Sequence, residues 1–434
     1  MNQVTKESKI KKQNMKLYSL YRMISMDIIF LYAIDFLFLT QVKNITASQY
    51  VLKSSAYAFF MIILQIPAAI IIDKLGTRKC TILGNLFNAV YLLIIMFAPN
   101  FIAIIIAEFI SAVCFSLKDI SDTTLLNQSI PEGKKKGEIF SKIEGRGQKN
   151  YYYINAVTSV LAGTLYTINP YIPIVCAFLI CVAATIISLG FQEAKEENVG
   201  EDKKQTKETS SEKTKRALEE LIEGFKFIIK SNRLRSLLLY SGIIWGIFCL
   251  ISTYRTSILK DVGISAQWIA IVSAIVGIAS GIGAKKQLQF HNKFKNKSLS
   301  IVLIVTSVIT ILTGIAVISN ISSTAILVII TVFYIILNII KGINGVITTR
   351  YLGNFTDEKI LPKIYSVNAI SRNIFRMLIG FLGSYLLDIT NTSHAAIITG
   401  IIFTIISILL ISYMKTRLGL RPEEYDKNEI KMKT

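Results

Sequence analysis

The sequence has few of the residues from which most enzyme sites are built. It holds 2 histidines and 5 cysteines in 434 residues, and the cysteines lack the spacing of metal ligands or of a disulfide framework. It also contains no H-E-x-x-H, no G-x-S-x-G and no glycine-rich phosphate loop followed by Lys-Ser or Lys-Thr. These absences argue against a metalloenzyme, a serine hydrolase and an ATP-driven pump, so we expect no enzyme, no metal ion and no cofactor.

Charged residues are scarce as well, and they are unevenly spread. Only 18% of residues are charged against 52% hydrophobic, and the charged residues cluster between apolar runs. The net charge of +20 would suit a nucleic-acid partner. The cations lie at the ends of apolar runs, however, where they fix orientation and attract anionic headgroups. The expected partner is therefore a lipid bilayer, and no nucleic acid is expected.

The apolar runs predict an all-α polytopic membrane protein, because each is close to the roughly 20 residues that cross a hydrocarbon core. Twelve spans are predicted, in two sets of six, at 17–39, 50–72, 80–98, 101–120, 150–168, 171–191, 236–257, 266–284, 299–318, 323–348, 364–388 and 394–414. The chain then divides into a basic tail (1–16), a first bundle (17–191), a linker (192–235), a second bundle (236–414) and a second tail (415–434).

The distribution of cations predicts the orientation of these spans. If the N-terminus is inside, cytoplasmic segments hold 40 of the 48 Lys and Arg residues, and the outer loops hold only Lys43 and Lys260. Such asymmetry over short loops sets membrane topology. Both termini are therefore expected in the cytoplasm.

The linker contains one segment with a helical apolar period. Residues 192–214 are polar and charged, with nothing to bury. The apolar residues that follow at helical spacing are Leu218, Leu221, Ile222, Phe225 and Ile229. They predict an amphipathic helix that lies at the inner membrane interface. A simple helical connection is the other interpretation, and the two do not exclude each other.

A short charged turn joins the second and third predicted spans. It contains Asp73, Lys74, Gly76, Arg78 and Lys79. This stretch resembles the loop between helices 2 and 3 of the major facilitator superfamily. It differs from the residue pattern of that loop at two positions. The resemblance implies two six-helix bundles, usually in a monomer, that expose a central cavity to each side of the membrane in turn.

The resemblance also implies a mechanical role for this turn as a cytoplasmic gate. Asp73 would bind the start of helix 11, near Lys363, while the inner side is closed, with Lys118 and Asp119 as further partners. The alternative is that its cations only fix orientation, which needs no gate.

Three acidic residues lie within predicted spans one and four. In the family that this chain resembles, the corresponding helices line the central cavity. Asp27 and Asp35 lie in span one and Glu108 in span four. Ionisable groups in hydrocarbon are costly, so each is a candidate for function. In a partly hydrated cavity Asp27 would bind and release protons. The alternatives are an ion pair with Arg22 or with an arginine of another span for Asp27, and contact with outer water for Asp35.

Spans seven and eleven add aromatic and cationic candidates. Trp245 lies within span seven, whereas Tyr254 and Arg255 are expected to anchor its outer end at the interface. Arg372 and Arg376 lie one turn apart on span eleven, and we expect them to pair with acids of other spans.

Span ten carries a polar stripe on an otherwise apolar helix. Tyr334, Asn338, Lys341 and Gly345 recur at helical spacing. The candidates for proton coupling and the substrate cavity are therefore Asp27, Asp35, Glu108, Trp245, Tyr334, Asn338, Lys341, Arg372 and Arg376.

The favoured function is proton-coupled secondary transport of a small molecule. The acids and aromatic residues suit export of hydrophobic or cationic compounds from a bacterial cell across its plasma membrane, as in drug-efflux members of the resembling family. The alternative is transport of an anion or nutrient through Lys341, Arg372 and Arg376. A membrane receptor or scaffold that transports nothing is a third possibility.

Overall fold

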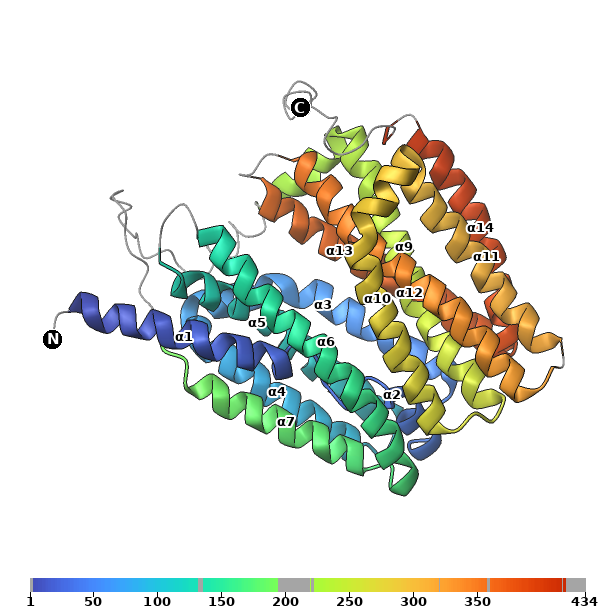
Figure 1. The fold of residues 1–434 in the computed structure, drawn as a ribbon, viewed down its shortest axis with the longest axis horizontal. Helices are drawn as coiled ribbons and strands as arrows, with labels where there is room; N and C mark the ends of the chain where they lie inside the picture. Colours follow the sequence, from blue (N-terminus) through green and yellow to red (C-terminus); the bar gives the residue numbers. More distant parts are fainter. Residues whose placement is uncertain are drawn as a thin grey trace. The chain divides into compact units, whose positions relative to one another are not determined.

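Helices make up nearly all of the described chain (Figure 1). The computed structural model describes residues 3–131, 136–193, 219, 222–319, 321–356, 360–415 and 417–418. The α-helices are α1 (Gln3–Ser25), α2 (Asp35–Leu37), α3 (Ala47–Leu75), α4 (Thr77–Phe97), α5 (Phe101–Ser129), α6 (Lys136–Ile168), α7 (Ile172–Leu189), α9 (Asn232–Asp261), α10 (Ala266–Phe294), α11 (Ser298–Ile318), α12 (Ser323–Asn354), α13 (Leu361–Ile389) and α14 (Thr392–Lys415). A π-helix covers Phe38–Val42, and a 3-10 helix covers Lys295–Lys297. Residues 222–230 are helical too, and no strand occurs within the described ranges.

Nine helices of the described chain are long and apolar enough to cross a membrane. They are α3, α4, α5, α7, α9, α10, α11, α12 and α14. Predicted spans one, five and eleven correspond to α1, α6 and α13, which are not among these nine. The protein is thus an all-helical, multi-span membrane protein, and the number twelve stays a prediction.

The prediction of one continuous helix over 17–39 is wrong. The first helix starts at Gln3 and stops at Ser25, and residues 26–34 are irregular, with Phe30 in the left-handed region at φ 68°. The side chain of Asp27 accepts the backbone N–H of Ile28 at 2.7 Å. Such local side-chain bonds compete with helical ones, which gives a physical reason for the break.

The contacts divide the chain into two compact units. The first unit comprises residues 1–35 and 63–217, and the second comprises 36–62 and 218–434. In the first, α1 packs on α6, and α4 on both α5 and α7. In the second, α9 packs on α13, α11 on α14 and α10 on α12. The pair α1 and α6 in the first unit corresponds to α9 and α13 in the second. The pair α4 and α7 corresponds to α11 and α14. A duplicated six-helix unit would give this repetition.

Residues 36–62, which the sequence analysis includes in the first bundle, have their contacts within the second unit. Ser48 on α3 shares a hydrogen bond of 2.8 Å with Ser384 on α13. Further along α3, a side chain at Gly380 of α13 would collide with Ser55. The first half of α3 therefore packs closely against α13.

Small residues set the distance between paired helices of the second unit. A Cβ at Gly283 on α10 would collide with the backbone of Ile339 on α12, and one at Gly342 with the backbone of Ser280. In the same way Gly314 on α11 meets the backbone of Ser393 on α14. These helices cross at backbone contact, which only glycine allows.

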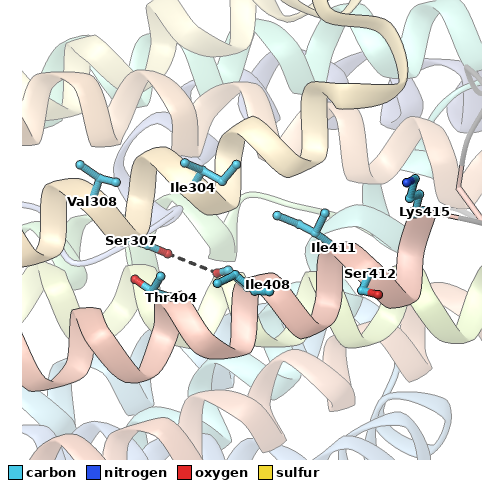
Figure 2. Close-up of a pocket in the computed structure, with 9 residues that line it drawn as sticks. Ile304, Ser307, Val308, Thr404, Ile408, Ile411, Ser412 and Lys415 are labelled. Carbon is cyan, nitrogen blue, oxygen red and sulfur yellow. Dashed lines mark hydrogen bonds between the residues drawn. The ribbon is translucent and has the colours of Figure 1, made fainter.

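The pair α11 and α14 is held further along by a polar contact. The hydroxyls of Ser307 and Ser407 lie 3.2 Å apart (Figure 2). Beyond this point towards Lys415 the two helices leave a cavity between them.

The helix at 222–230 has one face packed and one face open. Gly224 lies against the backbone of Lys363 on α13, and Glu223 forms an ion pair with Lys363 at 2.6 Å. Ile222, Phe225 and Ile229 are exposed, which agrees with an amphipathic helix. Leu218 and Leu221, which begin the predicted stripe, lie outside the described residues, and the interfacial position stays a prediction.

Candidate functional site

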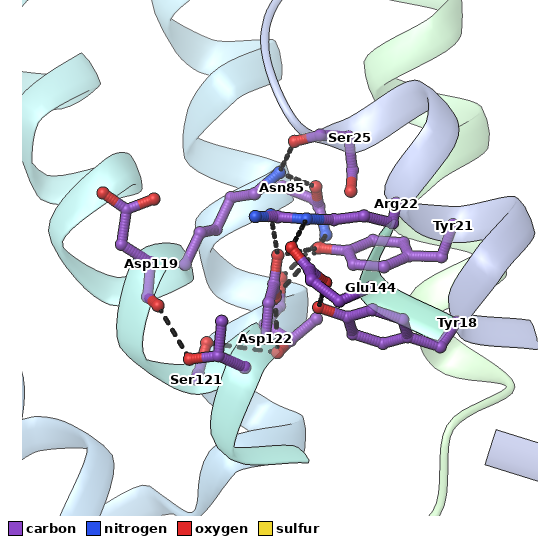
Figure 3. A network of polar contacts seen from close by, with 12 residues as sticks. Tyr18, Tyr21, Arg22, Ser25, Asn85, Asp119, Ser121, Asp122 and Glu144 are labelled. Carbon is purple, nitrogen blue, oxygen red and sulfur yellow. Dashed lines mark hydrogen bonds and ion pairs between the residues drawn. The ribbon is translucent and has the colours of Figure 1, made fainter. Parts of the chain in front are cut away.

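A buried network of charged side chains ties four helices of the first unit together (Figure 3). Arg22 on α1 donates from Nε to Glu144 on α6 at 3.0 Å, and its Nη1 lies 3.8 Å from Asp122 on α5. Tyr18 donates to the other oxygen of Glu144 at 2.7 Å. One guanidinium therefore joins two carboxylates from two different helices, and this geometry depends on all three helices keeping their places.

Lys118 occupies the centre of the same network. Its side chain is 2% exposed, and Nζ donates to the carbonyl of Ser25 at 2.6 Å and to Asn85 Oδ1 at 2.7 Å. Asn85 in turn donates to the hydroxyl of Tyr21 at 2.9 Å. The carbonyl of Ser25 is free for Lys118 because α1 ends there, so the break in the first span supplies this bond.

Asp122 is the most deeply buried acid of the network, with a side chain that is 0% exposed. It accepts hydrogen bonds from Tyr21 at 3.0 Å and from Thr81 at 2.9 Å. With Glu144 it balances the charges of Arg22 and Lys118. A proton bound by either carboxylate would leave one cation uncompensated and weaken the ties between helices.

Asp27 lies just beyond this network, in the irregular stretch after α1. It is half-buried, and the hydroxyl of Tyr151 on α6 lies 3.5 Å from its Oδ2. Within the described residues it has no ion pair, because Arg22 binds Glu144 and Asp122 instead. Arg22 is thus not the partner of Asp27, and the role of Asp27 in binding protons stays a prediction.

Glu108 and Asp35, the other two acidic candidates of the sequence analysis, lie in surroundings that differ from those of Asp27. Glu108 on α5 is 5% exposed and lies 3.4 Å from the hydroxyl of Tyr91 on α4, so it is held between those two helices. Asp35 is half-buried at the start of α2.

The second unit holds a group of cations around Trp245 on α9. The Arg372 guanidinium carbon lies 3.7 Å from the centre of the Trp245 ring, and Lys341 Nζ lies 5.7 Å from it. Neither cation has a carboxylate partner among the described residues. The expectation that Arg372 pairs with an acid of another span stays a prediction, and the contacts described for both cations are cation–π contacts to one indole.

Tyr334 and Asn338 of the polar stripe lie on the same side of α12 as Lys341. A cavity of about 10 Å³, roughly room for one water molecule, is lined by Arg255, Tyr334, Asn338 and Lys341 among others. Tyr334 is 2% exposed, and its hydroxyl donates to the carbonyl of Ile251 at 2.6 Å. Tyr334, Asn338 and Lys341 thus line one cavity, whereas Gly345, the fourth member of the predicted stripe, is exposed with nothing within 4 Å of its Cβ position.

Arg255 and Tyr254 are not interfacial anchors, contrary to the sequence analysis. Arg255 is 4% exposed and donates to Ser273 on α10 at 3.2 Å, and Tyr254 is fully buried and bonded to Thr399 on α14. Burial of the guanidinium is possible because Tyr334 lies beside it, 5.8 Å from ring centre to Cζ.

Arg376 is the second arginine of α13. It donates to the hydroxyl of Ser54 on α3 at 2.7 Å, and its guanidinium carbon lies 5.0 Å from the ring centre of Tyr57. Within the described chain it too has no carboxylate partner. The contacts described between α3 and α13 thus include an arginine that binds a hydroxyl and an aromatic ring.

The charged turn after α3 contains a glycine with a positive φ angle, as a tight turn requires. Gly76 has φ 85°, a left-handed conformation that favours glycine, and Arg78 donates to the carbonyl of Leu189 at the end of α7 at 3.1 Å. Asp73, Lys74 and Lys79 are exposed.

Lys118 and Asp119 are not joined to the turn in the way expected of gate partners. Lys118 binds Ser25 and Asn85, and the Asp119 carboxylate points away from the network (Figure 3). The gate role of the turn therefore stays a prediction for Asp73 and its neighbouring cations.

Several network residues escaped the sequence analysis. Tyr18, Tyr21, Asn85 and Asp122 were not singled out, because each lies on a helix that also carries apolar neighbours and gives no motif by itself. One signal was present: Tyr18, Tyr21 and Arg22 share one face of α1 by helical spacing, in a segment treated only as the inner end of a span.

The comparisons with known proteins identify the family. Residues 19–343 match the Major Facilitator Superfamily. The chain belongs to the major facilitator superfamily. It is therefore a membrane transporter for small molecules and not an enzyme. A search of curated proteins gave no match.

Solved structures of other transporters are similar over almost the whole chain. The nucleoside transporter NupG has a TM-score of 0.67 at 13% identity, covering 96% of this chain and 100% of that one. A POT family transporter in complex with 5-aminolevulinic acid has 0.64 at 14%, covering 94% and 95%. A bacterial homologue of the human lysosomal transporter Spinster, inward-facing and unoccupied, has 0.64 at 12%, covering 96% and 98%. At these identities the likeness concerns the fold.

Proposed function

We propose that this chain is a proton-coupled secondary transporter whose substrate carries an anionic group. It works by alternating access, as a monomer with twelve spans and both termini in the cytoplasm, in a bacterial plasma membrane. The sequence alone favoured export of hydrophobic or cationic compounds. The cations of the second unit favour the alternative substrate class.

The observation that carries the substrate class is the pair Arg372 and Lys341 at Trp245. Both cations are half-buried, and neither is neutralised by a carboxylate of the described chain. An uncompensated charge within a membrane span costs free energy. A ligand of opposite charge that binds there offsets this cost, which gives a transporter a reason to keep the charge. A carboxylate or phosphate accepts the forked donors of arginine, and Asn338 adds a neutral donor and acceptor nearby.

Asp27 and the charged network support proton coupling. Asp27 has no cation bound to it in the described residues and is contacted by a neutral phenol, so its negative charge is costly away from water and binding a proton removes that cost. A second candidate function, export of amphipathic cations, is favoured by the tyrosine beside this acid, because an acid next to an aromatic ring also suits a cationic ligand.

Purified protein in liposomes tests the substrate class. We expect organic anions, and not cations of equal size, to exchange across the liposome membrane. Arg372→Gln and Lys341→Gln should each weaken anion binding roughly 10- to 100-fold, the loss expected for one charged hydrogen bond. Lys293→Gln, an exposed lysine at the end of α10, is the matched control and should bind normally. Uptake of cations alone would refute the proposed substrate class.

An imposed pH difference tests coupling and direction. Antiport, as export requires, predicts accumulation in liposomes with an acidic lumen, whereas symport predicts it with an alkaline lumen. Asp27→Asn should abolish accumulation and leave exchange at equal pH intact. Normal accumulation by Asp27→Asn would exclude this residue as the proton site.

A further inference from the structure

The second unit has a long groove that shares no lining residue with the cavity at Tyr334 and Lys341. It lies between α11 and α14 and consists of two adjoining cavities of about 350 and 310 Å³, which share Ile411 and Lys415. Figure 2 shows the residues that line the larger one. The wall of the larger cavity is mainly aliphatic, from Ile304, Val308 and Ile408, whose side chains are 47 to 62% exposed.

The groove exists because the two helices diverge. At one end Gly314 and Gly400 bring them to backbone contact, and Ser307 and Ser407 are hydrogen-bonded midway. From there to the Lys415 end no glycine contact holds them within the described residues, and the space between them opens.

The length of the groove corresponds to one leaflet of a bilayer. From Lys297 to Val308 the chain rises roughly 16 Å at 1.5 Å per residue, about half of a hydrocarbon core roughly 30 Å thick. The groove thus reaches from the end of the helices to about the middle of the membrane.

Charge is confined to one end of the groove. Lys297 and Lys415 line its mouth with the hydroxyls of Ser300 and Ser412 nearby, and its lining contains no acidic residue. Both lysines are exposed and have no ion pair within the described chain. An apolar channel one leaflet long with two cations at its mouth is complementary to a lipid with a negatively charged headgroup.

We propose that the groove between α11 and α14 is a binding site for an anionic phospholipid. One acyl chain lies against Ile304, Val308 and Ile408, and the headgroup phosphate lies between Lys297 and Lys415. In the proposed orientation this lipid belongs to the cytoplasmic leaflet, where anionic lipids bind basic juxtamembrane groups.

Native mass spectrometry of the full-length protein tests the site, with phosphatidylglycerol and phosphatidylethanolamine of identical acyl chains as probes. We expect phosphatidylglycerol to be retained preferentially. Lys297→Gln with Lys415→Gln should weaken its binding about 25-fold, from roughly a fivefold loss for each lysine near the membrane surface. The matched control, Lys285→Gln with Lys286→Gln, removes the same charge from exposed positions on α10 and should bind normally.

A second variant separates the groove from general attraction of a basic surface. Ile411→Trp fills the junction of the two cavities and leaves both lysines in place, so it should reduce retention of both lipids. Equal losses in the two lysine pairs, or unchanged phosphatidylglycerol retention in Ile411→Trp, would overturn the proposal. Neither readout depends on transport, so a wrong substrate class does not affect it.

Discussion

At the scale of single residues, Arg22 shows how much depends on one guanidinium. It binds Glu144 and approaches Asp122, and the side chains of Arg22 and Glu144 are each only 11% exposed. Removal of one partner from a buried ion pair leaves the other charge uncompensated, which costs more than the pair itself contributes.

Arg22→Ala should therefore destabilise the protein by roughly 3–5 kcal/mol. Thermal unfolding of the purified protein in detergent measures this loss. Arg146→Ala, which removes the same side chain from an exposed position on α6, should change stability by less than about 0.5 kcal/mol. Adding Glu144→Gln to Arg22→Ala should restore part of the loss, because it removes the uncompensated carboxylate. Equal unfolding temperatures for Arg22→Ala and Arg146→Ala would contradict the network's importance.

The sequence identified individual charges at this scale but not their partners. Asp27, Lys118 and Arg372 stand out as charges within apolar runs, because hydrocarbon makes such residues rare. Their partners proved to be a tyrosine, a helix-end carbonyl and an indole. None of these could be predicted, since neutral partners occur throughout the chain and leave no pattern.

At the scale of elements, glycine decides where helices of the second unit cross. Gly283 on α10 is against the backbone of α12, whereas nothing lies within 4 Å of the Cβ position of Gly281 on the same helix. The two glycines are two residues apart and differ only in the face that they occupy.

Gly283→Ala should destabilise the protein by about 1–3 kcal/mol, because the added methyl group forces α10 and α12 apart. Gly281→Ala should be neutral or up to about 1 kcal/mol stabilising, since alanine is the better helix former. Thermal unfolding of the two variants side by side checks the difference. A similar stability for both would mean that α10 and α12 do not meet at Gly283.

The first predicted span shows the limit of hydropathy at this scale. Residues 17–39 have the composition of a span, yet α1 ends at Ser25. Hydropathy records the cost of transfer into lipid and is insensitive to backbone conformation. Irregular backbone is tolerated at membrane depth when protein or water satisfies its polar groups, and Lys118 satisfies the carbonyl of Ser25 here.

At the scale of the whole molecule, the charge asymmetry predicts an orientation that can be measured. In a variant without its five natural cysteines, Lys43→Cys and Lys260→Cys should react with a membrane-impermeant maleimide in intact cells. Lys79→Cys and Lys286→Cys should react only after the membrane is permeabilised. The cysteine-free protein is the control for background labelling, and the reverse pattern would show an inverted topology.

The sequence by itself determined that this is an all-helical membrane transporter of the major facilitator superfamily, because apolar length, charge between the runs and the turn at Asp73–Lys79 are local properties. Tertiary structure decided which charges share a network, that the cations at Trp245 have no described carboxylate partner, and where α11 and α14 part to form a groove. Those features depend on side chains brought together from separate helices, and the free energy of each contact exists only after the helices pack.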